Sequence, residues 1–232
     1  IKLEVAPKIA VYSPKTKLPW DDAVTLALTY AEIPYDVLYD PEIIEGKLSE
    51  YDWLHLHHED FTGQYGKFWG SYRHMPWYKE DVRAQEEMAR KYGFEKVSQL
   101  KLFIAQSIRD YVANGGFLFA MCSATDSYDI ALSAGGVDIC RQMFDGDPMD
   151  NNAQEKLDFS KTFAFKDFIL ETDPYVYEYS SIDATSTRKV HKEEDYFTLF
   201  EFSAKWDPVP TMLCQNHVNM IKGFMGQTTS YN

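Results

Sequence analysis

The chain has 232 residues, of which 45% are hydrophobic and 25% charged, the balance of a globular protein and not of a disordered one. Its longest apolar runs, such as 117–122, are far shorter than the roughly 20 residues of a membrane-spanning helix. The formal net charge of −13 argues against a nucleic-acid partner, because an acidic protein repels phosphate backbones.

Three cysteines, Cys122, Cys140 and Cys214, are too few for a disulfide scaffold, so at least one is free or paired outside the chain. The chain starts at Ile1 without an initiator methionine or a signal-peptide pattern, and it stops soon after an expected strand or turn. We therefore expect a fragment of a longer protein that forms a single domain, with a core at 8–140 and a β-rich elaboration at 141–232.

The first part of the sequence predicts a β-α-β unit. Short apolar runs at 8–13 and 35–40 predict two buried strands. Apolar residues at helical spacing lie between them and predict a helix that begins near Asp21 and ends before Pro34. Two strands joined by a helix over so short a stretch are typical of a parallel sheet.

The next elements continue this pattern up to residue 136. A third strand is predicted at 53–57, a helix late in the long segment 61–96, and a further helix from near Ser98 to the glycines at 115–116. The run 117–121 is apolar on both faces, which predicts a central strand, and a helix is predicted at 123–134. These elements indicate a doubly wound α/β core.

The pattern changes after Gly136. Aromatic residues at 163–168, 176–182 and 196–202 predict antiparallel strands, and 211–215 predicts a last buried strand. The fold class is therefore α/β, with a mainly parallel central sheet and an added antiparallel β region.

Cys122 is the strongest candidate for a catalytic residue. Ligands of a doubly wound sheet bind at the carboxyl ends of its strands, and Cys122 lies between a predicted strand and the helix that begins at Ser123. Such a strand-turn-helix placement is a nucleophile elbow, in which the helix dipole favours the thiolate and the next backbone amide stabilises an oxyanion. The alternative is a cysteine that merely packs in the core.

The run NGGFLFAMCSATDSYDIAL, at 114–132, resembles the elbow of the class I glutamine amidotransferase-like superfamily. Its glutaminase members carry G-x-C-x-G, whereas this chain has alanine at 120 and 124. The segment YDWLHLHHEDFTGQ is similar to the strand and loop that donate the second oxyanion amide, at Gly63 and Gln64. This resemblance covers 8–136 and implies a flavodoxin-like three-layer sandwich, with the Ser123 amide as the first oxyanion donor.

A resemblance over nearly the whole chain is to Bacteroidetes proteins labelled asparagine synthetase B-like. The strings PWDDAVTLALTYAEIPYDVLYD, YDWLHLHHEDFTGQYGKFW and IKGFMGQTT are similar to theirs. An asparagine synthetase also has an N-terminal catalytic cysteine and an ATP-pyrophosphatase loop, and this sequence shows neither. The resemblance implies an exported or periplasmic protein.

A cysteine nucleophile needs a base within reach. His57, His58 and Glu59 follow the third predicted strand, where they would lie beside Cys122 and move its protons; alternatively, they form a polar strand end satisfied by loop backbone. His217 follows the last predicted strand and is a second candidate for the base. Glutaminases place a glutamate two residues after this histidine, whereas Asn219 stands there in this chain.

His55 and His57 alternate on one strand, which is compatible with a metal pair. The sequence offers no further cluster of ligands at a suitable spacing, so we expect no metal. We also expect no cofactor, because no dinucleotide-binding or phosphate-binding loop is present. The aromatic segment 65–78 suits sugar or peptide stacking, a lid on the core, or a contact between copies of the chain.

Two hypotheses follow. The first is a glutamine amidotransferase-like hydrolase or amidohydrolase that acts through Cys122 on a small amide or acyl substrate. The second is a catalytically inactive binding or assembly module of the same fold. Carbohydrate is one candidate ligand of such a module. For either one we expect a small-molecule partner, no nucleic acid and no membrane span, and homo-oligomerisation is left open.

Overall fold

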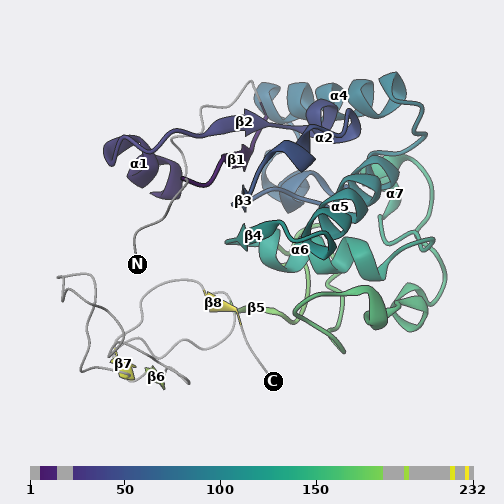
Figure 1. Cartoon of the computed structure of the whole chain (residues 1–232). Coiled ribbons are helices and arrows are strands. Elements are labelled where there is room, and N and C mark those ends of the chain that lie inside the picture. The colour runs from purple at the N-terminus through teal and green to yellow at the C-terminus, as the bar shows by residue number, and fades with distance from the viewer. Residues whose placement is uncertain (1–5, 15–22, 185–195, 199–219, 223–227, 230–232) are drawn as a thin grey trace. The chain divides into compact units, whose positions relative to one another are not determined.

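The computed structural model describes residues 6–14, 23–184, 196–198, 220–222 and 228–229 (Figure 1). The chain divides into two compact units, Ile1–Ile182 and Asp183–Asn232. All the described residues of the candidate site below lie in the first unit.

The centre of the first unit is a four-stranded, all-parallel sheet in the order β2-β1-β3-β4. Its strands are β1 (Ile9–Tyr12), β2 (Asp36–Leu38), β3 (Trp53–Leu56) and β4 (Phe117–Ala120). In register, Val11 of β1 pairs with His55 of β3, and His55 pairs with Phe119 of β4. The α/β class and the four predicted parallel strands are thus confirmed, and the sheet is compatible with a flavodoxin-like fold.

Helices and 3-10 turns connect and follow these strands. The α-helices are α1 (Ala23–Tyr30), α2 (Asp40–Ile44), α3 (Trp69–Tyr72), α4 (Pro76–Lys91), α5 (Val97–Ala113), α6 (Ser123–Ser133) and α7 (Gln142–Asp145). The 3-10 turns are Lys47–Glu50, Tyr65–Lys67, Ala153–Lys156 and Phe159–Lys161. Among the described residues, no helix has the length and apolar character that crossing a membrane requires.

One face of the sheet carries the main hydrophobic core. Alternate residues such as Ala10, Leu54 and Leu56 are fully buried there against α5, which presents Leu100, Ile104 and other apolar residues at helical spacing. Residues of α4 and α6 belong to the same cluster, and in Figure 1 these helices lie to one side of the strands, with α1 to the other. This packing fixes the carboxyl ends of the strands against the first turns of α2 and α6.

The prediction that 117–121 is a central strand is wrong for the described part of the chain. There, β4 pairs only with β3 and forms one edge of the sheet. Phe117 and Phe119 are 57% and 40% exposed. The strand is apolar on both faces because one face packs toward the core and the other carries the exposed rings of Phe117 and Phe119.

The stretch from 141 to 182 also differs from its prediction. The segments 163–168 and 176–182 form no strands, and their one antiparallel feature is an isolated bridge between Leu170 and Ser180. The chain is instead held by side chains. Asp129 of α6 accepts hydrogen bonds of 2.8 Å from the backbone amides of Phe163, Ala164 and Phe165. Aromatic residues of this stretch, among them Phe168 and Tyr179, pack in a second hydrophobic cluster. Their alternation in the sequence resembles that of a strand, which is why strands were predicted here.

The second unit contributes two short antiparallel pairs. β5 (Asp183–Ala184) pairs with β8 (Thr228–Thr229), and β6 (Tyr196–Thr198) pairs with β7 (Met220–Lys222). β6 falls within the predicted strand 196–202. The predicted strand 211–215 lies outside the described residues.

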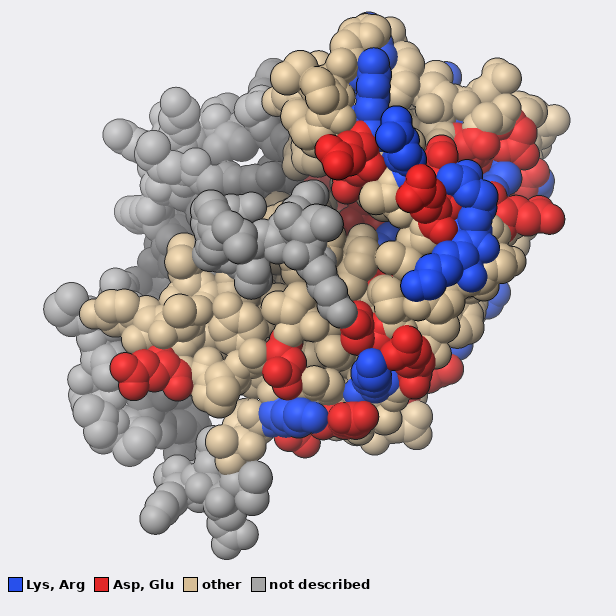
Figure 2. Space-filling view, turned by 90° about the horizontal axis from the view of Figure 1, so that it is seen from above, with Lys and Arg blue, Asp and Glu red and all other residues tan. Residues whose placement is uncertain are grey.

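In Figure 2, Asp and Glu side chains are interspersed with Lys and Arg on part of the described surface, and uncharged residues occupy the rest of it. α4 has this character, with pairs such as Arg90 and Glu86 at 3.6 Å. The negative net charge is therefore not one continuous acidic field on that face.

Candidate functional site

Cys122 occupies the turn between β4 and α6 in an uncommon backbone conformation. It is the N-cap of α6, with φ of 50° and ψ of −140°, and it is exposed. A residue with a Cβ atom rarely adopts positive φ, and it persists there only where the surroundings hold it. An exposed residue at positive φ between a strand and a helix is compatible with a nucleophile elbow, and the assignment stays a prediction.

Backbone hydrogen bonds hold this turn on both sides. Met121 donates its amide to the carbonyl of Leu56 at 3.0 Å, and Ala124 donates to the carbonyl of His57 at 3.3 Å. Thr125 closes the first turn of α6 with a 2.5 Å bond from its hydroxyl to the carbonyl of Cys122. The end of β3 and the first turn of α6 therefore fix Cys122 together.

The Ser123 amide is suited to act as an oxyanion donor. Ser123 is the first residue of α6, so its amide has no carbonyl partner within the helix. The two following amides already bond to carbonyls of His57, Met121 and Cys122. The helix dipole adds positive potential at this end.

Gly63 and Gln64, the predicted second donors, are both buried in the loop after β3. Gly63 has φ of 83°, and a Cβ atom there would come within 2.7 Å of the amide nitrogen of Ser98, in the first turn of α5. The Gln64 side chain donates to the hydroxyl of Thr62 at 3.1 Å. Only glycine permits the close approach of this loop to α5; the assignment as oxyanion donors stays a prediction.

His57 and His58 lie together directly after β3. Their Nδ1 atoms are 2.6 Å apart and their ring centroids 4.5 Å apart. A hydrogen bond between two imidazole Nδ1 atoms requires that one donates and the other accepts. The donating ring then has its lone pair at Nε2, the arrangement that a general base needs.

Glu59 turns back onto the backbone of this loop. Its carboxylate accepts a 2.8 Å hydrogen bond from the amide of His57. Its carbonyl accepts a 2.9 Å bond from the hydroxyl of Ser127, which lies in α6. The bond from the His57 amide is the kind that the alternative interpretation, a polar strand end satisfied by loop backbone, predicts. The bond from Ser127 connects Glu59 to α6.

The other two histidines considered in the sequence analysis are His55, as a metal ligand, and His217, as a base. His55 is fully buried in β3, and its ring stacks on Phe119 with centroids 5.6 Å apart. His217 lies outside the described residues. The proton-transfer assignments of His57, His58, Glu59 and His217 therefore stay predictions.

A buried polar network stands at the carboxyl ends of β1 and β2, and the sequence analysis missed it. Lys101 of α5 donates to both carboxylate oxygens of Asp40, at 2.8 and 3.0 Å, to the hydroxyl of Tyr12 at 2.9 Å and to that of Tyr39 at 3.2 Å. The Tyr12 hydroxyl also donates to Asp40. Lys101 and Asp40 are each 2% exposed.

The protonation of this network follows from its burial and its charges. Burial raises the pKa of Tyr39 to about 12, and it raises that of Tyr12 as well. Burial alone would lower the pKa of Lys101, but the Asp40 carboxylate more than offsets this and raises it. One face of α5 consists of residues 97, 100, 101, 104 and 108, which are apolar except for Lys101. A lysine at helical spacing among apolar residues is the sequence signal that could have indicated a buried, paired lysine.

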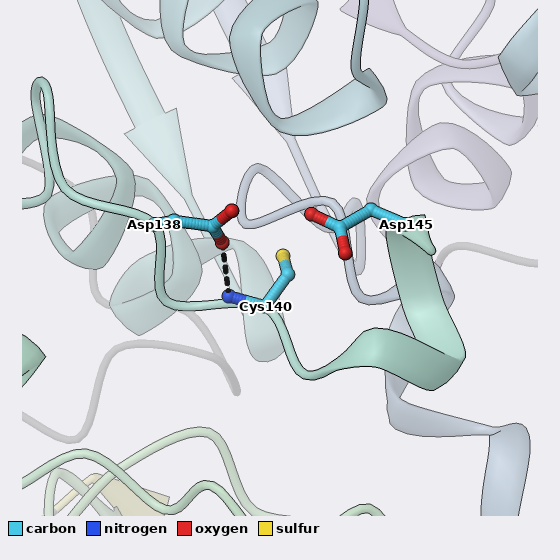
Figure 3. Close-up of side chains that lie close together, drawn as sticks. All are labelled: Asp138, Cys140 and Asp145. Carbon is cyan, nitrogen blue, oxygen red and sulfur yellow. Dashed lines mark hydrogen bonds between the residues drawn. The ribbon is translucent and has the colours of Figure 1, made fainter. Parts of the chain in front are cut away.

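A second missed cluster surrounds the other described cysteine. Figure 3 shows the Cys140 thiol between the carboxyl groups of Asp138 and Asp145, and the ligand atoms of the three lie within 4.8 Å of one another. In the described part of the chain this is the only such group with the residue types of a metal site.

The ammonium of Lys96 already supplies positive charge to this cluster. It contacts Asp138, Asp145 at 3.1 Å and Asp147 at 2.6 Å. Burial raises the pKa of the Cys140 thiol well above its ordinary value, so the thiol stays protonated at neutral pH. A metal ion would have to displace the lysine and remove this proton, so the geometry is that of an ion-pair network.

Comparisons of the chain with protein-family models, with curated proteins and with solved structures found no match.

Proposed function

We propose that this chain is a glutamine amidotransferase-like hydrolase or amidohydrolase of flavodoxin-like fold, and that Cys122 attacks a small amide or acyl substrate. The observation that carries the proposal is the backbone of Cys122, with φ of 50° and ψ of −140° between a parallel strand and a helix. Strain of this kind gathers at functional sites. A cysteine that only packs gains nothing from positive φ, and Cys122 is exposed.

The chemistry divides into two steps. The Cys122 sulfur forms a bond to the substrate carbonyl carbon, and the leaving amine or alcohol departs with a proton. Water then attacks the resulting thioester and the carbon–sulfur bond breaks, which releases the acid, and a proton of the water goes to the sulfur. The Ser123 amide stabilises the oxyanion in both steps, with Gly63 and Gln64 proposed as further donors.

The proton carriers are proposed from position. The His57 carbonyl accepts the amide of Ala124, two residues beyond the nucleophile, at 3.3 Å. Its ring and that of His58 are joined through Nδ1, which fixes complementary tautomers in the pair. Glu59 holds the backbone at His57. His217 remains a candidate from sequence alone.

The second candidate is an inactive binding module of the same fold. The observation that favours it is the placement of Gly63, which packs on the first turn of α5, and of Glu59, whose carboxylate is engaged by backbone. A module of this kind would retain the elbow without turnover.

The deciding experiment is a burst assay with p-nitrophenyl acetate. We expect about one equivalent of p-nitrophenolate per chain, and an intact mass increased by one acetyl group that peptide mapping assigns to Cys122. Ammonia release from glutamine and from asparagine, measured next, tests for an amidohydrolase.

The matched controls are Cys122→Ala and Cys140→Ala. Cys122→Ala should lose both the burst and the acetyl adduct, whereas Cys140→Ala should keep them, because the Cys140 thiol is buried and protonated. An equal burst in Cys122→Ala, or no adduct in the unaltered chain, would rule out the nucleophile and favour the binding module.

A further inference from the structure

A group of exposed aromatic rings comes from two segments of the first unit, 68–77 and 175–177, and we call it the aromatic platform. Its exposed members are Tyr72, Trp77, Tyr175 and Tyr177, whose exposed fractions are 43%, 43%, 68% and 44%. Phe68 and Trp69 lie half-buried beneath them. Large aromatic side chains usually lose most of their surface on folding, so four neighbouring exposed rings mark a surface for interaction.

The rings of the platform hold one another in place. Phe68 is the centre, with ring centroids 5.9 Å from Tyr72, 6.0 Å from Trp77 and 5.9 Å from Tyr177. Tyr72 and Trp77 are 5.3 Å apart. Most of these contacts are edge-to-face or tilted, which is the favourable geometry for aromatic pairs. The rings are therefore ordered before any ligand arrives.

Two segments distant in sequence build this surface, and a buried lysine clamps them. Lys67, only 3% exposed, donates to the carbonyl of Glu171 at 2.8 Å and to that of Asp173 at 3.2 Å. Gly70 lies so close to the second segment that a Cβ atom would come within 2.9 Å of the Pro174 carbonyl oxygen. A buried cation and a close backbone approach are costly features that a mobile surface loop does not need.

A polar side chain is fixed at the edge of the rings. The guanidinium of Arg73 lies 4.8 Å from the centroid of Trp69 and 5.9 Å from that of Tyr175. It also donates a hydrogen bond to the carbonyl of Gly70. With the hydroxyls of Tyr72 and Tyr175, this provides hydrogen-bond donors beside flat apolar faces.

From this surface we infer that the aromatic platform binds an uncharged oligosaccharide of two or three sugar units. The apolar faces of sugar rings stack on flat aromatic rings, and their hydroxyls need donors and acceptors at the rim, which Arg73 and the tyrosines supply. The ligand is neutral, because acidic Glu171 and Asp173 adjoin the platform and the net charge is −13, so an anionic polymer would be repelled.

The size of the platform argues against a protein partner. A stable protein interface takes roughly 20–30 residues from each side. Here the exposed aromatic group consists of four rings, and charged or polar residues such as His74, Lys79 and Glu80 follow it in the chain. Four rings are enough to stack a short sugar chain, and a second copy of this protein is the outcome that the test below would reveal.

The test measures tryptophan fluorescence and calorimetric binding with maltotriose, cellotriose, xylotriose and chitotriose. We expect saturable binding of at least one of them, weakened about tenfold or more in Trp77→Ala and in Tyr175→Ala, since a central aromatic anchor carries much of the affinity of a small site. Tyr175 is the most exposed ring, so its removal leaves the fold intact even if Trp77→Ala does not.

The matched control is Tyr30→Ala, which removes a 93% exposed tyrosine of α1 outside the platform and should bind as the unaltered chain does. Cys122→Ser should also bind unchanged, so the result is independent of the proposed catalysis. Absence of binding at millimolar sugar, or equal loss in Tyr30→Ala, would overturn the inference. So would a concentration-dependent dimer that Tyr175→Ala abolishes, because it would assign the platform to self-association.

Discussion

The carboxyl ends of β1 and β2 carry Tyr12 and Asp40, which are buried, and Tyr39, which is partly buried. Buried Lys101 joins them in what we call the sealed network. The ends of β3 and β4 lead instead to His57 and to Cys122, which is exposed on a strained turn. Both regions lie at the same edge of one parallel sheet, the edge where such sheets bind ligands. The groups of the first region are paired with one another, whereas the second region holds Cys122 at a positive φ and is the site where we propose the chemistry.

Glu59 links these two regions. Its carboxylate accepts a hydrogen bond from the amide of His57, and its negative charge is the smallest contribution, after burial, Asp40 and Tyr39, to the raised pKa of Tyr12. The other groups of the network lie within 3.2 Å of the Lys101 ammonium.

The largest effect should follow removal of the buried cation. Lys101→Met leaves the Asp40 carboxylate buried without its positive partner, which should lower the free energy of unfolding by about 3–5 kcal/mol. Urea denaturation followed by circular dichroism measures this change. Lys156→Met, which breaks an exposed pair with Asp150 at 3.4 Å, is the control and should cost no more than about 1 kcal/mol.

The pair Lys101→Met and Asp40→Asn extends this test. The double variant should be less destabilised than the sum of the two single variants, because each single change leaves a buried charge and the double change leaves none. Simple additivity would show that the two groups do not form a sealed pair in solution.

Alkaline pH should weaken the sealed network by a smaller amount. Burial raises the pKa of Tyr39 from about 10 to about 12, and the pKa of Tyr12 and of Lys101 is raised as well. The folded state therefore keeps protons that the unfolded chain releases first, so stability falls as the pH rises above about 10. For Tyr39 alone the loss amounts to about 2–3 kcal/mol near pH 12.

The measurement is the urea midpoint between pH 9 and pH 12, with phenolate absorbance at 295 nm recorded in parallel. A fraction of the tyrosines should ionise only together with the loss of native circular dichroism. If all tyrosines ionised in one step near pH 10 while the native spectrum persisted, the network would be open to water.

An intermediate effect is expected at the link between β3 and α6. Ser127 is fully buried, and its hydroxyl donates to the Glu59 carbonyl at 2.9 Å and accepts the Phe61 amide at 3.4 Å. Ser127→Ala should cost about 1–2 kcal/mol, since two buried backbone groups lose a partner. Ser107→Ala is the control: that hydroxyl bonds to its own helix at an exposed position, so the change should be neutral or slightly stabilising.

The features that the sequence could predict depend on residues that are neighbours in the chain. The parallel strands and long helices follow from local periodicity, and the elbow follows from a cysteine between a strand and a helix with small neighbours at Ala120 and Ala124. The positions of His57 and Glu59 after β3 also follow from the strand boundary. All of these are relations between neighbours in the chain.

What the sequence did not predict depends on contacts distant in the chain. Asp40 and Lys101 are 61 residues apart, and Lys67 reaches a carbonyl 104 residues away. The strand predicted at 163–168 is absent because of another contact between residues distant in the chain. Asp129 of α6 accepts hydrogen bonds from three backbone amides of this segment, which a neighbouring strand would otherwise satisfy. Alternating aromatic residues cannot distinguish these two ways of satisfying backbone groups.

The smallest expected effect is a gain in stability at the elbow itself. Cys122→Gly should raise the free energy of unfolding by about 1 kcal/mol relative to Cys122→Ala, because glycine adopts φ of 50° without the steric cost that a Cβ atom brings. Both variants lack the thiol, so the acetyl adduct should be absent from each. Thermal unfolding of the two variants side by side isolates the backbone strain from the loss of sulfur. If alanine were as stable as glycine, the turn would be relaxed, and Cys122 would lose the property that distinguishes this region from the sealed network beside it.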